Sequence, residues 1–282
     1  MKQIRKVHEA WEFYDEFILQ SLSKRSQTTE TGRWKNHISP IVGEKIINEL
    51  NIVDLLKLRK SLESKRLSPQ TVFHCLSLLR RILNRIVDYD HSVQVPKFRN
   101  VMPQFDNRRV RYLSRPEFDL LLNILKKKSK AWVDISLFAV NTGLRRGEIF
   151  NLGFENINKR DRKICILDSK THKNRVIPLN GTAFKIISDN KNRKTFTLSA
   201  PKIFEQAVKE SGLNDGIKDS RQKVVFHTLR HTFASWLVQG GIKLEVVSKL
   251  LGHSSLNMTM RYAHLAPSQA EAAVNLISQK LK

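Results

Sequence analysis

Two histidines, an arginine and a tyrosine lie close together near the carboxyl end of the sequence. Arg230 is three positions after His227, and Tyr262 is nine positions after His253. Guanidinium and imidazole groups donate hydrogen bonds to phosphate oxygens, and a phenol is a nucleophile once it loses its proton. Each residue alone has an ordinary interpretation as a helix cap, a surface charge or a packed ring. Together they predict a site that holds one phosphate and attacks it.

The apolar pattern around these residues predicts the helices that position them. Apolar residues recur at helical spacing after His227 until Gly240-Gly241, so His227 stands at a helix start, where free N–H groups favour an anion. A second apolar helix is predicted over residues 243–251 and ends at Gly252. His253 is then expected on the turn that follows this helix, with the tyrosine on a short segment beyond it.

A segment further upstream contributes another arginine. In TGLRRGEIF, Gly143 allows a sharp turn, so that Arg145 leaves its helix and points into a cleft. Glu148 lies three positions later. Residues 162–179 then alternate between apolar and polar side chains around a polar, basic turn, which predicts a β-hairpin.

The motifs TGLR, HTLRH, LGHSS and MRYAH occur in this order. They resemble the catalytic domain of the tyrosine recombinases, the phage integrase family, and most of all the integrases of temperate phages and integrative elements. The resemblance implies that Glu148 orients its basic neighbours. It also implies a catalytic set made of Arg145, Lys170, His227, Arg230, His253 and the nucleophile Tyr262.

The choice of the catalytic lysine depends on the register of the hairpin. Members of the family carry this lysine in a pattern that ends in R-x-x-P-L, and here Lys170 leaves Arg175 and Pro178-Leu179 at the expected spacing. A neighbouring register would select Lys173 instead. The resemblance implies that the lysine protonates the departing sugar oxygen.

The chemistry implied for the other residues is transfer of a DNA strand to the protein. Arg145 and Arg230 would offset the charge that builds on the phosphate oxygens, with His253 as a further donor. Attack by Tyr262 would leave a 3′-phosphotyrosine and a free 5′-hydroxyl, while His227 accepts the phenolic proton or holds a phosphate oxygen. The covalent link keeps the bond energy, so rejoining needs no ATP. The sequence has no P-loop and no carboxylate cluster suited to two metal ions, so we expect no cofactor and no metal.

The composition fits a partner with many negative charges. The 282 residues include 50 Lys and Arg against 26 Asp and Glu, a formal net charge of +24. Double-stranded DNA is the expected partner, and a membrane surface is the weaker alternative. No apolar run is long enough to span a bilayer, and no signal-peptide pattern is present. Cys75 and Cys165 lie in apolar contexts and are predicted to be buried thiols, which fits a cytoplasmic protein of a bacterial host.

The predicted fold is mainly α with a small β-hairpin, an α+β arrangement in two domains. Residues 1–95 are expected to form a helical core-binding domain. In it, Ser23–Thr31 is a turn or loop, and Ser68-Pro69 starts a helix that ends near Tyr89. Residues 96–111 are interpreted as a basic interdomain linker. Residues 112–282 form the catalytic domain, which starts with a helix capped by Ser114 and ends with a tail helix.

Several basic residues outside the catalytic set are candidates for contacts with the DNA backbone. An ordinary solvated charge is an equally good interpretation of each one. The candidates are Arg33, Lys35, Arg80, Arg81, Arg108, Arg109, Arg111, Lys173 and Arg175.

The resemblance also implies an assembly of four copies on two duplexes, with residues 266–282 as the candidate contact between copies. Relatives with an arm-binding domain have an additional amino-terminal segment for which the sequence shows no clear room, so directionality factors and host DNA-bending proteins are open expectations. Two alternatives remain: a type IB-like topoisomerase or resolvase with the same site, and a DNA-binding protein whose site has decayed.

Overall fold

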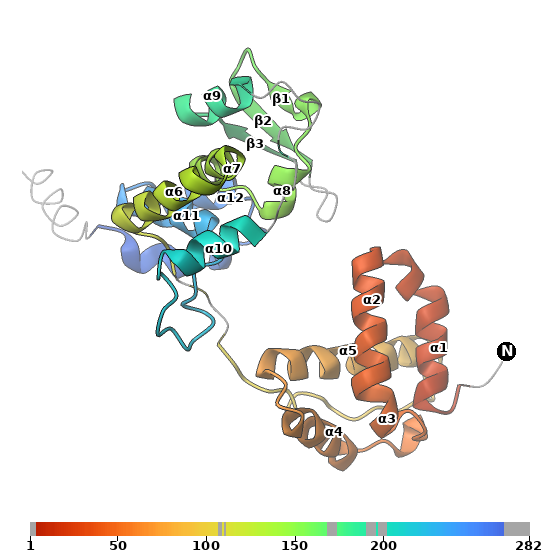
Figure 1. The fold of residues 1–282 in the computed structure, drawn as a ribbon. Coiled ribbons are helices and arrows are strands. Elements are labelled where there is room, and N and C mark those ends of the chain that lie inside the picture. Colours follow the sequence, from red (N-terminus) through yellow and green to blue (C-terminus); the bar gives the residue numbers. More distant parts are fainter. Residues whose placement is uncertain are drawn as a thin grey trace, which may run out of the picture. The chain divides into compact units, whose positions relative to one another are not determined.

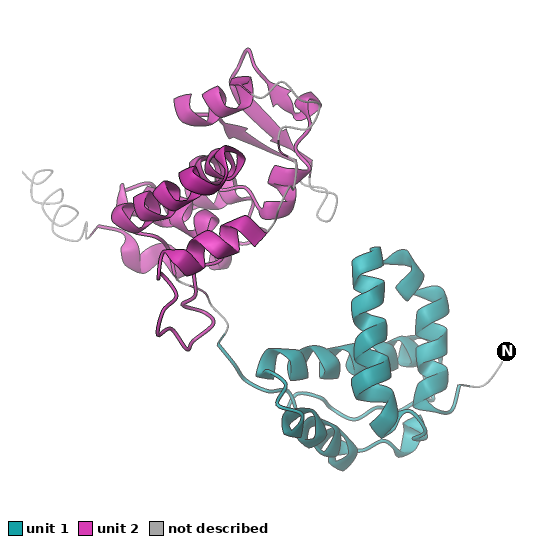
Figure 2. Ribbon diagram, in the orientation of Figure 1, with its two compact units in different colours: residues 1–107 teal, residues 108–282 magenta. Residues whose placement is uncertain are grey.

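The chain folds into two compact units, which Figure 2 shows in different colours. A computed structural model describes residues 4–106, 109, 111–167, 174–189, 196 and 202–267. The first unit comprises Met1–Asn107 and the second Arg108–Lys282. Each has a hydrophobic core of its own. No helix in the described part of the chain is long and apolar enough to cross a membrane.

The first unit is helical. Its longest helix begins where Ser68 accepts a hydrogen bond from the Thr71 amide, and Pro69 occupies the first turn, as predicted. Its apolar face is buried against the other helices, and the indole rings of Trp11 and Trp34 stack with their centroids 4.9 Å apart. The helices are α1 (Val7–Phe17), α2 (Lys24–Arg33), α3 (Ser39–Val42), α4 (Ile52–Ser64) and α5 (Pro69–Tyr89).

The prediction of a turn over Ser23–Thr31 is wrong, because this segment forms most of helix α2. Ser23 caps the helix by accepting a hydrogen bond from the Ser26 amide. Near the other end, the buried Glu30 carboxylate accepts hydrogen bonds from the Tyr14 hydroxyl at 3.0 Å and from Arg81 at 2.8 Å. Residues distant in the sequence, Tyr14 and Arg81, therefore donate the hydrogen bonds that the buried Glu30 carboxylate of this polar helix needs.

The first part of the predicted linker belongs to the first unit. Phe98 and Val101 are buried in its core, and the Val101 carbonyl accepts a hydrogen bond from Arg59 at 3.2 Å. The apolar residues of this segment lie among prolines and arginines without a regular period, so the sequence did not predict this packing.

The second unit is mostly helical with a three-stranded antiparallel sheet in the order β1-β2-β3, which confirms the predicted fold class (Figure 1). The predicted hairpin is β2–β3, with Ile164 opposite Ile177, and β1 was not predicted. Its elements are α6 (Arg115–Lys128), α7 (Lys130–Thr142), α8 (Arg146–Phe150), β1 (Ile157–Asn158), β2 (Lys163–Ile166), β3 (Arg175–Pro178), α9 (Gly181–Asp189), α10 (Lys202–Glu210), α11 (Thr228–Gln239), α12 (Leu244–Leu251) and the short 3₁₀ segments η5 (Leu256–Met258) and η6 (Met260–Leu265).

One face of the sheet and four of the helices build the main core of this unit. Ile164, Ile166 and Ile177 point from the strands into it. Helices α6, α7, α9 and α10 contribute most of the remaining side chains, and α11 packs closely on α7. The opposite face of β2 exposes Cys165, so the predicted burial of this thiol is wrong, whereas Cys75 is buried as expected.

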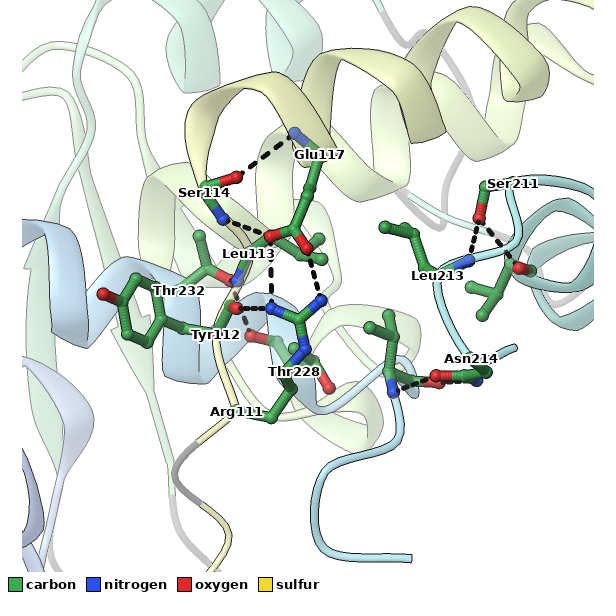
Figure 3. Close-up of polar contacts among 12 residues, drawn as sticks. Arg111, Tyr112, Leu113, Ser114, Glu117, Ser211, Leu213, Asn214, Thr228 and Thr232 are labelled. Atoms are coloured by element: carbon green, nitrogen blue, oxygen red, sulfur yellow. Dashed lines mark hydrogen bonds and ion pairs between the residues drawn. The ribbon is translucent and has the colours of Figure 1, made fainter. Parts of the chain in front are cut away.

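The start of the second unit is tied to α11 (Figure 3). The Leu113 amide donates to the Thr232 hydroxyl at 2.9 Å, and the Leu113 carbonyl accepts from the Trp236 indole at 3.0 Å. Ser114 then caps α6 in the predicted capping box with Glu117. These contacts hold α11 against the beginning of the unit.

Candidate active site

Arg230 is buried, and its guanidinium is fixed at both ends by main-chain carbonyls. It donates to the Gly143 carbonyl at 2.7 Å and to the Leu251 carbonyl at 2.6 Å. These carbonyls lie at the ends of α7 and α12, where helices leave acceptors without partners. Burial, followed by the charge of Arg145, lowers the pKa of Arg230 to about 9, which still leaves it protonated at neutral pH.

Both of these helix ends require glycine. Gly143 and Gly252 have a φ of +63°, in the left-handed region that other residues rarely adopt. A Cβ atom at position 143 would lie 2.3 Å from Cδ1 of Phe233, and one at position 252 would lie 2.7 Å from Cδ of Arg175. The two glycines thus let the ends of both helices approach Arg230 closely.

Arg145 stands at the start of α8, as the turn at Gly143 predicts. Its guanidinium donates to Glu148 Oε1 at 2.8 Å and to the Gly252 carbonyl at 3.3 Å. Leu251 and Gly252 are neighbours in the chain, and each carbonyl binds one of the two arginines. The end of α12 therefore brings the guanidiniums of Arg145 and Arg230 together, although the residues are far apart in the sequence.

Glu148 joins Arg145 to a second arginine. Arg175 on β3 donates to its two carboxylate oxygens at 3.0 and 2.7 Å, and the Arg145 amide donates to it at 2.7 Å. Burial alone would raise the pKa of Glu148, but the hydrogen bonds from Arg175 and Arg145 outweigh it and lower the pKa. The predicted orienting role of Glu148 has this geometric support.

Two of the arginines predicted to contact DNA are paired with carboxylates of the same unit. Only 9% of the Arg175 side chain is exposed, because the guanidinium is paired with Glu148. Arg111 donates to both carboxylate oxygens of Glu117, at 2.6 and 3.1 Å (Figure 3), and this pair lowers the pKa of Glu117 to about 2. These partners lie 27 and 6 positions away in the sequence. Both arginines thus have a carboxylate partner within the chain, and their contact with DNA stays a prediction.

His253 follows the glycine that ends α12 and binds the segment that carries the tyrosine. Its Nδ1 atom lies 2.7 Å from the buried Thr259 hydroxyl. Burial, then the charges of Arg230 and Arg145, lowers the pKa of His253 to about 4, so the ring is neutral at pH 7. If Thr259 donates to Nδ1, the hydrogen is on Nε2, which is then free to donate to a phosphate oxygen.

Tyr262 lies in η6 with 3% of its surface exposed. Its ring packs with residues of α11 and α12, among them Ala234, Val247 and Leu251. Its hydroxyl lies 2.6 Å from Nδ1 of His231. Burial raises the pKa of Tyr262 to about 12, against the opposing charges of Arg261 and Arg230.

His231 was not predicted to belong to the site. It lies in α11 next to Arg230 and one helical turn after His227, a spacing that places the two histidines on the same face. Their rings meet edge to face with centroids 5.0 Å apart. The HTLRH motif contained this spacing, but only its first histidine, His227, was assigned a role from the sequence.

His227 occupies the position before the first turn of α11, as predicted. The residue as a whole is exposed to solvent, although the surrounding chain partly desolvates its ring. Desolvation by the surrounding chain, then Arg230, Arg145 and Arg109, lowers the pKa of His227. Arg109 therefore adds positive charge to this region.

The site includes most of the predicted catalytic residues but not all of them. Arg145, Glu148, Arg230, His253 and Tyr262 are linked through the end of α12 and through α11. Lys170, Lys173 and Arg108 lie outside the described residues, as does all of the predicted tail contact 266–282 except Ala266 and Pro267. Within the described ranges, no group of three or more His, Cys, Asp or Glu residues could hold a metal ion.

The first unit holds other predicted phosphate contacts. Arg33, Arg80 and Arg81 line one cavity in this unit, and Lys35 is exposed. Arg81 is paired with Glu30, and its guanidinium lies 5.7 Å from the centre of the Tyr14 ring. The cavity combines positive charge with one buried carboxylate.

The sequence profile of the phage integrase family matches residues 111–269, more than half of the 282 residues. The chain belongs to the phage integrase family. It is 31% identical over 188 residues to the integrase of Salmonella phage P22, an alignment that covers 59% of this chain and 47% of that protein. The chain thus spans about half the length of this relative.

Other members of the family are similar over most of the chain. A tyrosine recombinase of Pseudothermotoga lettingae is 29% identical over 259 residues, which cover 83% of this chain and 87% of that protein. The fold matches a lambda integrase dimer bound to a COC′ core site, with a TM-score of 0.73 and 17% identity over 91% of this chain and 95% of that one. It also matches the Tn1549 transposon integrase in complex with a circular intermediate DNA, with a TM-score of 0.73 and 15% identity over 98% of this chain and 100% of that one.

Proposed function

We propose that this phage integrase family member is a site-specific DNA recombinase that cleaves and rejoins DNA through a 3′-phosphotyrosine, and so integrates or excises a phage or mobile element. One observation carries the proposal. The adjacent carbonyls of Leu251 and Gly252 hold the guanidiniums of Arg230 and Arg145 together, and the segment that carries Tyr262 is packed on the same helix. Two fixed cations beside a phenol suit attack on a phosphodiester.

Each chemical role in the cleavage step has a candidate residue. The phenolic oxygen of Tyr262 forms a bond to phosphorus, the bond to the 5′ oxygen breaks, and its electron pair leaves with that oxygen. Lys170 is the candidate that gives the leaving oxygen a proton, and His227 the candidate that accepts the phenolic proton. Arg145 and Arg230 stabilise the charge on the two nonbridging oxygens.

The electrostatics of the site favour a nucleophile that is dormant without DNA. Burial holds the pKa of Tyr262 near 12, so the phenol keeps its proton at neutral pH. The phosphate ester bound by the arginines is the only reactant that attack requires besides this phenol, and no ATP takes part. Release of the phenolic proton during attack is therefore the step that the surrounding imidazoles and arginines must assist.

Double-stranded DNA is the partner that the charge and the relatives support. The net charge of +24 favours a polyanion, and lambda integrase has been described as a dimer on a core site and as a tetramer on a Holliday junction. We infer a homo-tetramer on DNA, with residues 266–282 as the candidate contact between copies, and action in the cytoplasm of a bacterial host. Directionality factors and host DNA-bending proteins are further candidate partners.

The first unit is proposed as the core-binding domain that clamps the duplex. The arginines of α5 that line its cavity, Arg80 and Arg81, are the candidate phosphate contacts, together with Arg33 and Lys35. Affinity from such contacts does not depend on the base sequence and weakens as salt increases.

A nicked suicide duplex that carries the crossover site of the element tests the proposal. Because of the nick, the short fragment with the free 5′-hydroxyl diffuses away after cleavage and cannot rejoin. The covalent intermediate therefore accumulates, and it survives SDS. We expect wild type to form a 3′-linked adduct and Tyr262→Phe to form none. Tyr112→Phe is the control, since this tyrosine accepts a hydrogen bond from Gln239 at the surface of the same unit. Equal adduct yields from wild type and Tyr262→Phe would refute the proposal.

The topoisomerase alternative has a separate readout. An enzyme of that kind relaxes a supercoiled plasmid by cleaving and closing one strand and yields no recombinants. We expect plasmids with two crossover sites to give recombinant products with this protein. Relaxation without recombinants would favour the alternative.

A further inference from the structure

The hydroxyl of Tyr262 is bound by a histidine that is not among the predicted catalytic residues. Nδ1 of His231 lies 2.6 Å from this hydroxyl, the distance of a strong hydrogen bond. The two rings are inclined at 50° with centroids 5.9 Å apart. Among the described residues, His231 is thus the hydrogen-bond partner of the Tyr262 side chain.

The His231–Tyr262 pair is buried among apolar side chains. Ala234, Val238, Val247 and Leu251 pack around the tyrosine ring. Only 5% of His231 is exposed. A buried imidazole costs free energy unless it is hydrogen-bonded, so an apolar side chain would serve better if the position were needed for packing alone.

The charges around His231 keep it uncharged. Burial, then His227, Arg261, Arg230 and Arg109, lowers the pKa of His231 to about 3. A neutral imidazole has one acceptor nitrogen and one donor nitrogen. The phenol keeps its proton at neutral pH, and with the ring hydrogen on Nε2, Nδ1 accepts the hydrogen bond that the Tyr262 hydroxyl donates.

We propose that His231 is the positioning residue of the nucleophile: its Nδ1 atom holds the Tyr262 hydroxyl and directs the phenolic oxygen during strand cleavage. The proposal rests on the proposed function of the site. From the sequence, His227 was expected to accept the phenolic proton or to hold a phosphate oxygen, and no residue was assigned to hold the phenol. His227, exposed at the start of α11, remains available for a phosphate oxygen or for the released proton, while the buried His231 fixes the phenol.

The backbone gives this arrangement its rigidity. His231 and Arg230 are consecutive residues of α11, a helix that is buried around most of its circumference. The arginine is fixed by two carbonyls, so the histidine beside it has little freedom to move. A helix that is fixed against the phosphate-binding arginine therefore also fixes the direction of the attacking hydroxyl. Small errors in such an alignment are costly, on the order of 10²-fold for about 1 Å.

Two substitutions of similar polarity distinguish positioning from packing. In His231→Asn, the amide group places a polar atom where Nδ1 lies. In His231→Gln, the amide atoms correspond to Nε2 and lie beyond the position that the hydroxyl needs. Both remain polar and uncharged, so neither requires the helix to bury a charge. We expect His231→Asn to keep its cleavage rate within about fivefold of wild type and His231→Gln to lose about 10-fold or more.

The measurement is the single-turnover rate of adduct formation at saturating DNA on two suicide duplexes. One has an ordinary phosphodiester at the crossover site, and the other has sulfur in place of the bridging 5′ oxygen. A thiolate leaves without a proton, so this duplex rescues the loss of a general acid but not a badly directed nucleophile. We expect the His231→Gln defect on both duplexes, with DNA affinity unchanged.

Each outcome decides the proposal. Equal rates for His231→Asn and His231→Gln would overturn it, because the position of the polar atom would then be irrelevant. Rescue of His231→Gln by the sulfur duplex would also overturn it and place His231 at the leaving group. Absence of an adduct from wild type on both duplexes would refute the proposed function itself, which keeps the two failures distinct.

Discussion

The arginines of the two units are held in different ways. In the second unit, Arg230 is buried between two carbonyls, and Arg145 is bound by a carboxylate and a carbonyl. In the first unit, Arg80 and Arg81 lie exposed on α5, and 45% of the Arg81 side chain is accessible although it is paired with Glu30. The same residue type is thus fixed in one unit and largely solvated in the other.

This difference indicates different tasks. A cation that is already oriented needs no rearrangement when charge develops in a transition state, and this is the condition for a large effect on rate. A solvated cation attracts phosphate from a distance but loses hydration and side-chain freedom on contact, so its contribution is small and depends on salt. We therefore assign rate to the arginines of the second unit and affinity to those of the first.

The largest expected effect comes from Arg230→Lys. Lysine keeps the charge but cannot bridge the carbonyls of Gly143 and Leu251 while also presenting two donors to a phosphate. We expect the single-turnover cleavage rate at saturating DNA to fall on the order of 10³-fold. Arg115→Lys, an exposed control in α6, should stay within about twofold, because its partner is the exposed Asp119. A loss of less than tenfold for Arg230→Lys would contradict the assignment.

Glu148→Gln should have the next largest effect. Loss of this carboxylate frees Arg145 and leaves the buried Arg175 without its charged partner. We expect a cleavage rate lower by about 10- to 100-fold, since both charge and position are disturbed. Glu117→Gln removes a similar bidentate pair with Arg111 outside the site. It should lower stability but not the cleavage rate, and equal rate losses in both variants would contradict a role for Glu148 in orienting Arg145.

The buried histidine also makes the second unit sensitive to acid. The pKa of His231 is about 3 in the folded chain against an ordinary value of 6.5, so between these two pH values the unfolded chain binds more protons than the folded chain. Its contribution to stability is therefore complete above pH 6.5 and declines as the pH falls, by about 1.4 kcal/mol per pH unit. We expect the free energy of opening α11, measured by hydrogen exchange, to fall between pH 7 and pH 5.5 in wild type. In His231→Asn the decline should be smaller by about 1.4 kcal/mol.

The smallest effect is expected in the first unit. Arg80→Ala should weaken DNA binding severalfold and reduce the slope of log affinity against log salt by about 1, if Arg80 contacts a phosphate. The cleavage rate at saturating DNA should not change. Arg59→Ala is the control, because Arg59 is occupied by Glu63 and the Val101 carbonyl. A lower rate at saturating DNA would remove the distinction between the two groups of arginines.

The features that were predictable from the sequence depend on local chemistry. Ser68 and Ser114 start helices because each side chain accepts a hydrogen bond from an amide of the first turn. Pro69 fits the first turn because it has no amide hydrogen that would need a partner. Gly143 and Gly252 end helices because each adopts a positive φ. The positions of Arg145 and His253 follow directly from these turns, so the motifs revealed most of the site.

The features that were missed depend on partners far away in the chain. The ion pair of Arg175 was not predicted because Glu148, its partner, lies on another element. The segment Ser23–Thr31 looked like a turn because the satisfaction of Glu30 by Tyr14 and Arg81 requires the folded unit. For the same reason His231, whose partner Tyr262 is 31 positions away, gave no sign of its hydrogen bond.

The central claim is that the phenolic oxygen of Tyr262 forms the covalent bond to DNA, at a phosphate held by Arg145 and Arg230. The most direct measurement is mass spectrometry of the trapped adduct after digestion of both protein and DNA. The account predicts a single modified peptide from the segment MRYAH, with the nucleotide joined to Tyr262 through its 3′-phosphate. A nucleotide on any other residue, or a link through a 5′-phosphate, would contradict it.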